Sequence, residues 1–139
     1  MRNRLPYLIL IIFALNLIWE FFHYRLYVDL TGIPSTIHLI GAAFVDIFLV
    51  STIFLIVSLK DKNLKWMKFP SKKDYFMVAV VGITLAFIWE LTNISLGRWE
   101  YKEIMPTIFG VGLSPLVQLA FTSILSLIIF NRFSQRLNS

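Results

Sequence analysis

Ionisable side chains interrupt the long apolar runs of this chain at helical spacing. Asn16, Glu20 and His23 follow one another at i, i+4 and i+7, which places them on one face of a helix. Asp46 and Glu90 stand well inside two other apolar runs. Ionisable groups inside a bilayer are expensive, so each one is a candidate functional group. We therefore predict that Glu90, Asp46 and Glu20 act as general acid or base groups, with Asp46 as the partner of Glu90.

Amide and hydroxyl groups accompany these carboxyls. Asn93 lies three residues after Glu90, and Ser114, Gln118 and Thr122 form an i, i+4, i+8 stripe. We predict that Asn93 and Gln118 orient a ligand. The same pattern also suits interhelical hydrogen bonds that only hold the helices together.

Aromatic residues lie close to the carboxyls in the sequence. Aromatic faces stabilise cations, whether a quaternary ammonium group or a carbocation. The predicted ligand-binding residues are Trp89, Asn93, Trp99, Tyr101, Gln118, Trp19 and His23. Near the end of an apolar run, Trp19, Glu20 and His23 equally suit an ordinary membrane interface. No closely spaced histidines favour a metal site, and we predict neither a metal nor a cofactor.

The elements that position these residues follow from composition. The chain has 139 residues, of which 58% are hydrophobic and 15% charged, with a mean hydropathy of +0.74. Four apolar runs, at about 5–22, 38–59, 75–96 and 108–130, each approach the roughly 20 residues of a membrane-spanning helix. Transmembrane strands alternate apolar and polar residues over about half that length. The sequence predicts an all-α bundle of four transmembrane helices in a single domain over 1–139.

The net charge and the absence of cysteine exclude further kinds of site and of ligand. No cysteine is present, which excludes disulfides, thiolate nucleophiles and Cys-ligated metals. The net charge of +5 comes from basic residues that flank the apolar runs, which indicates anionic lipid rather than nucleic acid. Ten Lys and Arg residues belong to the two termini and the 60–73 loop, against three in the other loops. The positive-inside rule predicts a multi-pass protein of the cell (inner) membrane with both termini cytoplasmic, and it places the carboxyls in the outer half of the bilayer.

A short repeat relates the two halves of the chain. Residues 15–20 read Leu-Asn-Leu-Ile-Trp-Glu and residues 85–90 read Leu-Ala-Phe-Ile-Trp-Glu, an offset of 70 residues. This predicts a duplicated helical hairpin, in which the halves are related by an axis along the membrane normal. Glu20 and Glu90 are then expected at equivalent depths, facing one another across the bundle.

The second half carries a set of motifs at fixed spacing, namely Trp89-Glu90, Gly97-Arg98-Trp99, Tyr101 and Pro115-Leu116. Over about residues 75–131 this pattern resembles the small integral-membrane lycopene cyclase domain of the heterodimeric bacterial and fused archaeal type. That family has a Trp-acid pair, a Gly-x-Trp, an aromatic residue and a Pro-Leu-Glu-Glu motif. This chain departs from it at Val117 and Gln118, which stand in place of the two glutamates.

The resemblance implies a redox-neutral, isomerase-type protein of carotenoid biosynthesis that acts on or binds an isoprenoid. Two other functions fit the same residues. One is a non-catalytic subunit or assembly partner, in a homo- or hetero-oligomer with another small membrane subunit. The other is a small transporter in which Glu20, Asp46 and Glu90 carry protons or cations. The expected partners are a membrane lipid or isoprenoid ligand and, in an oligomer, another small membrane subunit.

Overall fold

Four long helices form the protein. The computed structural model describes residues 4–30 and 34–136, and its helices are α1 (Leu5–His23), α2 (Ser35–Ser58), α3 (Lys72–Ser95) and α4 (Leu113–Arg136). Short 3₁₀ turns, η2 (Tyr24–Leu26) and η3 (Lys65–Lys68), and a two-stranded hairpin, β1 (Thr107–Ile108) with β2 (Val111–Gly112), lie between them. The prediction of an all-α four-helix bundle is confirmed.

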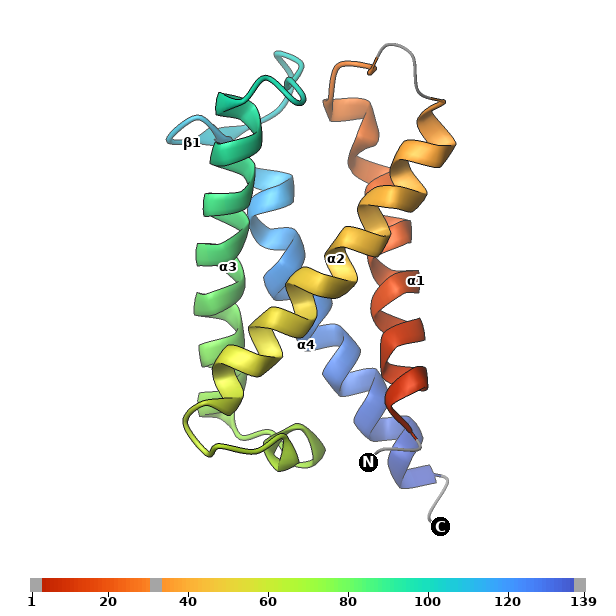
Figure 1. The fold of residues 1–139 in the computed structure, drawn as a ribbon, viewed down its shortest axis with the longest axis vertical. Helices are drawn as coiled ribbons and strands as arrows, with labels where there is room; N and C mark the ends of the chain where they lie inside the picture. The colour runs from red at the N-terminus through yellow and green to blue at the C-terminus, as the bar shows by residue number, and fades with distance from the viewer. Residues whose placement is uncertain (1–3, 31–33, 137–139) are drawn as a thin grey trace.

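The helices run alternately up and down the bundle (Figure 1). The start of α1, the end of α4 and the α2–α3 loop lie at one end, here called the proximal end. The opposite, distal end carries the ends of α1 and α3 and the hairpin. Helix α2 crosses the bundle obliquely, from beside α1 at the distal end to beside α3 at the proximal end. This oblique path separates the distal halves of α2 and α3.

Each of the four helices is long and apolar enough to cross a membrane. A helix of 24 residues, such as α2, is about 36 Å long, which exceeds the hydrocarbon core of a bilayer. Large apolar side chains cover the outside of the bundle; Phe48 is 73% exposed and Phe76 is 69% exposed. Exposed apolar surface on this scale is typical of a protein that faces lipid.

Helix boundaries differ from the predicted ones most clearly at α4. The predicted start at 108 falls in the hairpin, and the helix begins at Leu113 and continues to Arg136. Phe109 and Gly110 connect the strands with φ angles of 52° and 79°. Two consecutive residues of positive φ are typical of the tight turn of a two-residue hairpin and are incompatible with a helix. An apolar run alone did not reveal this turn, because Ile108, Phe109 and Val111 are as hydrophobic as the helix that follows.

Helices α3 and α4 approach closely at Gly82. A Cβ atom built on Gly82 lies 2.9 Å from the Cα atom of Ala120, closer than real contacts allow. The absence of a side chain at this position therefore sets the distance between the two helices. Small residues at such crossings are typical of helix packing in membranes.

We expect the substitution Gly82→Ala to lower the free energy of unfolding by about 1–3 kcal/mol, because the added methyl group has to displace the α4 backbone. Gly41→Ala is the matched control, since a Cβ atom at Gly41 meets nothing within 4 Å. Thermal unfolding of the detergent-solubilised variants measures the difference. Equal stability of the two variants would contradict the close packing at Gly82.

Candidate functional site

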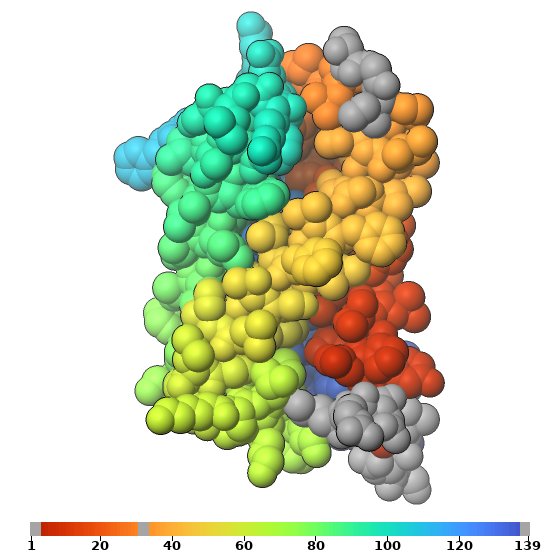
Figure 2. Space-filling model, viewed as in Figure 1, coloured from red at the N-terminus to blue at the C-terminus, as the bar shows by residue number. Residues whose placement is uncertain are grey.

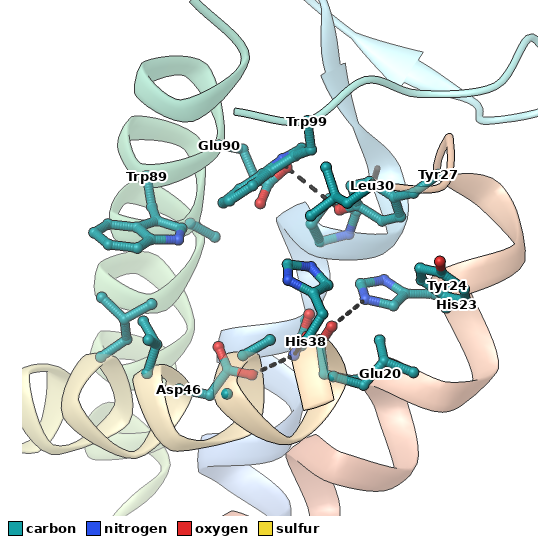
Figure 3. A pocket seen from close by; sticks show the side chains of 18 of the residues that line it. Glu20, His23, Tyr24, Tyr27, Leu30, His38, Asp46, Trp89, Glu90 and Trp99 are labelled. Atoms are coloured by element: carbon teal, nitrogen blue, oxygen red, sulfur yellow. Dashed lines mark hydrogen bonds and ion pairs between the residues drawn. The ribbon is translucent and has the colours of Figure 1, made fainter. Parts of the chain in front are cut away.

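A cavity of about 460 Å³ lies in the distal half of the bundle, lined by residues from all four helices. Figure 2 shows the molecular surface hollowed between the distal part of α2 and the distal end of α3, where α2 diverges. The surface of the cavity is mostly apolar, and polar and aromatic side chains from all four helices contribute to its lining (Figure 3). An apolar cavity of this size with a few polar groups is typical of a small-molecule site.

The amide of Gln118, on α4, connects polar groups of α1 and α2. Its Nε2 atom lies 2.9 Å from Oε1 of Glu20, 2.9 Å from Oδ2 of Asp46 and 3.2 Å from Oδ1 of Asn16. The Oγ1 atom of Thr122 also donates to Oδ1 of Asn16, at 3.1 Å. Since an amide nitrogen carries two protons, three acceptors compete for them. Glu20 and Asp46, here called the carboxyl pair, are thus brought together around one nitrogen.

His23 extends this network toward the start of α4. Its Nε2 atom lies 3.2 Å from Oε2 of Glu20, and its Nδ1 atom lies 2.9 Å from Oγ of Ser114. A neutral imidazole donates through one nitrogen and accepts through the other. The Glu20 carboxyl is therefore held by Gln118 on one oxygen and by His23 on the other.

Glu90 occupies a second polar site on the α3 side of the cavity. Its Oε2 atom accepts hydrogen bonds from Tyr101 at 2.6 Å, from Trp99 at 3.2 Å and from Tyr27 at 3.3 Å. Glu90 is only 6% exposed. No hydrogen bond within residues 4–30 and 34–136 reaches its other oxygen, Oε1. Hydrogen bonds from three donors stabilise the charged form of a carboxylate.

The donors to Glu90 are held in place by a pairing of two distant segments. Tyr27 and Tyr101 form an antiparallel bridge between the segments that follow α1 and α3. The backbone N–H of Val28 donates to the carbonyl of Glu100, and that of Lys102 donates to the carbonyl of Leu26, both at 2.9 Å. Each half of the chain thereby contributes one tyrosine to the same carboxylate.

Burial and the neighbouring carboxylate keep both tyrosines protonated. Burial, followed by the negative charge of Glu90, raises the pKa of Tyr27 far above its ordinary value. Burial and the hydrogen bond to Glu90 likewise raise the pKa of Tyr101. Because ionisation would place a second negative charge beside Glu90, both phenols remain hydrogen-bond donors across the physiological pH range.

We therefore expect the substitutions Tyr27→Phe and Tyr101→Phe to leave the absorbance titration of the tyrosines unchanged between about pH 9 and 11, where ordinary tyrosines ionise. The physical reason is that the raised pKa keeps both phenols protonated in that range. Near-ultraviolet spectra of the two variants and the wild type provide the measurement. A titration reduced by one tyrosine in either variant would contradict the assignment.

The cavity brings together most of the residues predicted to form a site. Those that line it are Glu20, His23, Asp46, Trp89, Glu90, Trp99 and Gln118. Tyr101 contacts Glu90 without lining the cavity. Glu20 and Glu90 lie on opposite sides of it, as Figure 3 shows, which is compatible with the duplicated hairpin. The duplication itself remains a prediction.

Two of the predicted ligand-binding residues lie elsewhere. Asn93 does not line the cavity; it donates to the carbonyl of Trp89 at 2.7 Å and accepts from Arg98 at 3.0 Å. Both ends of its amide are thus used to stabilise the end of α3. Trp19 packs against Phe121 and lines a separate, apolar groove between α1 and α4. Its position on α1, one residue before Glu20, turns it away from the cavity.

Three polar or aromatic residues of the cavity were absent from the predicted set. They are Tyr24, Tyr27 and His38. Tyr27 had one signal in the sequence, since an aromatic residue follows the Trp-Glu pair in each half of the chain. The significance of that signal depends on the bridge to Tyr101, which only the folded chain reveals.

Within the part of the chain that the structure describes, no group of three His, Asp or Glu side chains is arranged to hold a metal ion. Comparison of the chain with models of protein families, with curated proteins and with solved structures finds no match. The fold and the site define a helical protein with four potential membrane spans and a distal cavity that contains two separate carboxyl sites.

Proposed function

We propose that this protein binds the end of a long, apolar isoprenoid in its distal cavity and isomerises it by acid–base chemistry. The observation that carries the proposal is the presence of two separate carboxyl sites, the carboxyl pair and Glu90, on opposite sides of one mostly apolar cavity. A cyclisation that begins and ends with a proton transfer requires one group that gives a proton and one that takes it. The motifs that resemble those of lycopene cyclase domains imply the same chemistry.

Access from the bilayer supports an apolar ligand. The cavity opens between the distal halves of α2 and α3, and its wall contains Val45, Leu49 and Ala86. A hydrocarbon chain dissolved in the membrane can enter sideways through such an opening without crossing water. The volume of about 460 Å³ suits one end of a long isoprenoid, with the remainder in lipid.

The carboxyl pair supplies the proton. Two carboxyl groups close together in a low-dielectric site bind a proton between them, because two adjacent negative charges repel each other. Transfer of this proton to a terminal double bond forms a C–H bond and leaves a carbocation. A second double bond of the substrate then closes a ring, and the cation moves into that ring.

Glu90 accepts the proton that leaves the ring, and this restores a double bond. The product has the same atoms and oxidation state as the substrate. The Oε1 atom of Glu90 is the proposed acceptor, because its three hydrogen-bond donors all approach Oε2. The faces of Trp89 and Trp99 stabilise the intermediate cation.

Gln118 takes the position of an acid in the related motif and has a different role here. It is the hydrogen-bond donor that holds Glu20 and Asp46 together. The acid in this chain is then provided by α1 and α2 rather than by α4. This arrangement reconciles acid–base chemistry with the replacement of the two motif glutamates.

A continuous path for ions through the bundle has less support than a binding pocket. The proximal half of the bundle is packed with fully buried aliphatic side chains, including Val50, Ile53, Val57 and Val78. A proton or ion path requires polar groups on both sides of the midplane. The three cavity carboxyls all lie in the distal half, which favours a binding pocket over a small transporter.

Expression in a lycopene-accumulating host tests the proposed reaction. We expect a product of the same mass as lycopene with shortened conjugation, and we expect Glu90→Gln to reduce its yield at least a hundredfold, since the amide cannot accept the proton. Glu103→Gln, which changes an exposed glutamate, is the matched control. Chromatography with absorption spectra provides the measurement.

Unchanged lycopene with the wild-type protein would reject stand-alone cyclisation and favour a non-catalytic subunit. Normal yield with Glu90→Gln would remove Glu90 from the reaction.

We further propose that the protein lies in the cell membrane with its proximal end in the cytoplasm. Since the chain has no cysteine, single cysteines report the orientation directly. In intact cells, a membrane-impermeant maleimide is expected to label Lys102→Cys in the distal loop and to leave Asn63→Cys in the proximal loop unlabelled. The reverse pattern would contradict the orientation.

A further inference from the structure

The distal cavity has an acidic lining. Three carboxyl groups line it, those of Glu20, Asp46 and Glu90, together with His23 and His38, and His23 lies 3.2 Å from Glu20. No lysine or arginine of residues 4–30 and 34–136 lines it. The nearby basic residue Arg98 instead donates to Asn93, outside the cavity. Glu90 accepts only from neutral donors, and burying a charge without a charged partner is costly, so this side of the cavity favours a ligand that brings positive charge.

One carboxylate oxygen is available for such a ligand. Glu90 and Asp46 are only 6% and 8% exposed, and both line the cavity. All three donors to Glu90 approach its Oε2 atom, and within the described ranges no hydrogen bond reaches Oε1. An acceptor of a buried side chain that borders a cavity and has no donor within the described ranges is available to a ligand that supplies the partner.

Two indole side chains lie beside the Glu90 carboxylate. Trp89 precedes Glu90 on α3, Trp99 donates its Nε1–H to Glu90, and both indoles line the cavity. Figure 3 shows the two indoles on the same side of the cavity as the Glu90 carboxylate. Indole faces attract cations, most strongly where water is excluded. The carboxylate of Glu90 and the indoles of Trp89 and Trp99 therefore all favour a positively charged ligand.

We infer that the distal cavity binds a lipophilic cation, a molecule with an apolar body and one positive charge, and that the charge lies between Glu90 and the faces of Trp89 and Trp99. The aliphatic wall takes the apolar body, and the opening between α2 and α3 admits it from the bilayer. The inference uses the cavity of the proposed reaction and goes beyond it, because it requires neither proton transfer nor turnover.

Two ions of the same shape and opposite charge test the inference. Isothermal titration calorimetry of the purified, full-length protein in lipid nanodiscs is carried out with tetraphenylphosphonium and with tetraphenylborate, and empty nanodiscs give the partition background. We expect saturable binding of the phosphonium and none of the borate. Glu90→Gln should weaken phosphonium binding at least tenfold, and Glu103→Gln, at an exposed site, should leave it unchanged.

Two further measurements keep the test decisive. Trp89→Leu keeps every carboxyl and is expected to weaken phosphonium binding about threefold to tenfold by removing an indole face. Circular dichroism of each variant verifies that the helices are retained. Equal binding of both ions, or phosphonium binding unaffected by Glu90→Gln in a folded variant, would overturn the inference.

The outcome is separable from that of the proposed reaction, because binding is measured without turnover. Phosphonium binding in a protein that leaves lycopene unchanged supports this inference alone. Cyclisation by a protein that does not bind the phosphonium contradicts this inference alone.

Discussion

The cost of holding carboxyl groups inside an apolar helical bundle is the constraint on which the site depends. Two of the three carboxyls, Glu20 and Asp46, are joined by the single amide of Gln118. Glu90 is held on the other side of the cavity by the hydroxyls of Tyr27 and Tyr101 and by the indole of Trp99. Each carboxyl therefore has hydrogen-bond donors from outside its own helix, and the polar groups hold the distal halves of the helices in register.

Packing of the helices decides where this polar layer is accessible. The close contact of Gly82 with Ala120 holds α3 against α4, and the oblique path of α2 closes the proximal half with aliphatic side chains. The distal half of α2 lies away from α3, which leaves the cavity open at its side. A tight proximal core and an open distal cavity thus follow from one helix crossing, and they suit a ligand that arrives through the bilayer.

Particular residues show how far the sequence alone could lead. The four spans were predictable because each is a continuous apolar run, and the carboxyls could be chosen as candidate site residues because nothing local explains an ionisable group in such a run. The start of α4 could not be predicted from the sequence, because the Phe109–Gly110 turn lies within an apolar stretch. For Asn93, the spacing from Glu90 does not reveal that Arg98 and the carbonyl of Trp89 contact its amide.

The sequence by itself determined the four helices, their alternation and the half of the bundle in which the polar groups lie, because hydrophobic runs and their polar interruptions are local properties of the chain. Only the tertiary structure decided which polar groups meet. Gln118 reaches Glu20 across 98 positions of the sequence, and Tyr27 reaches Glu90 across 63. Hydrogen bonds act over about 3 Å, so partners so distant in the chain are chosen by the crossing of helices and the pairing of loops rather than by spacing.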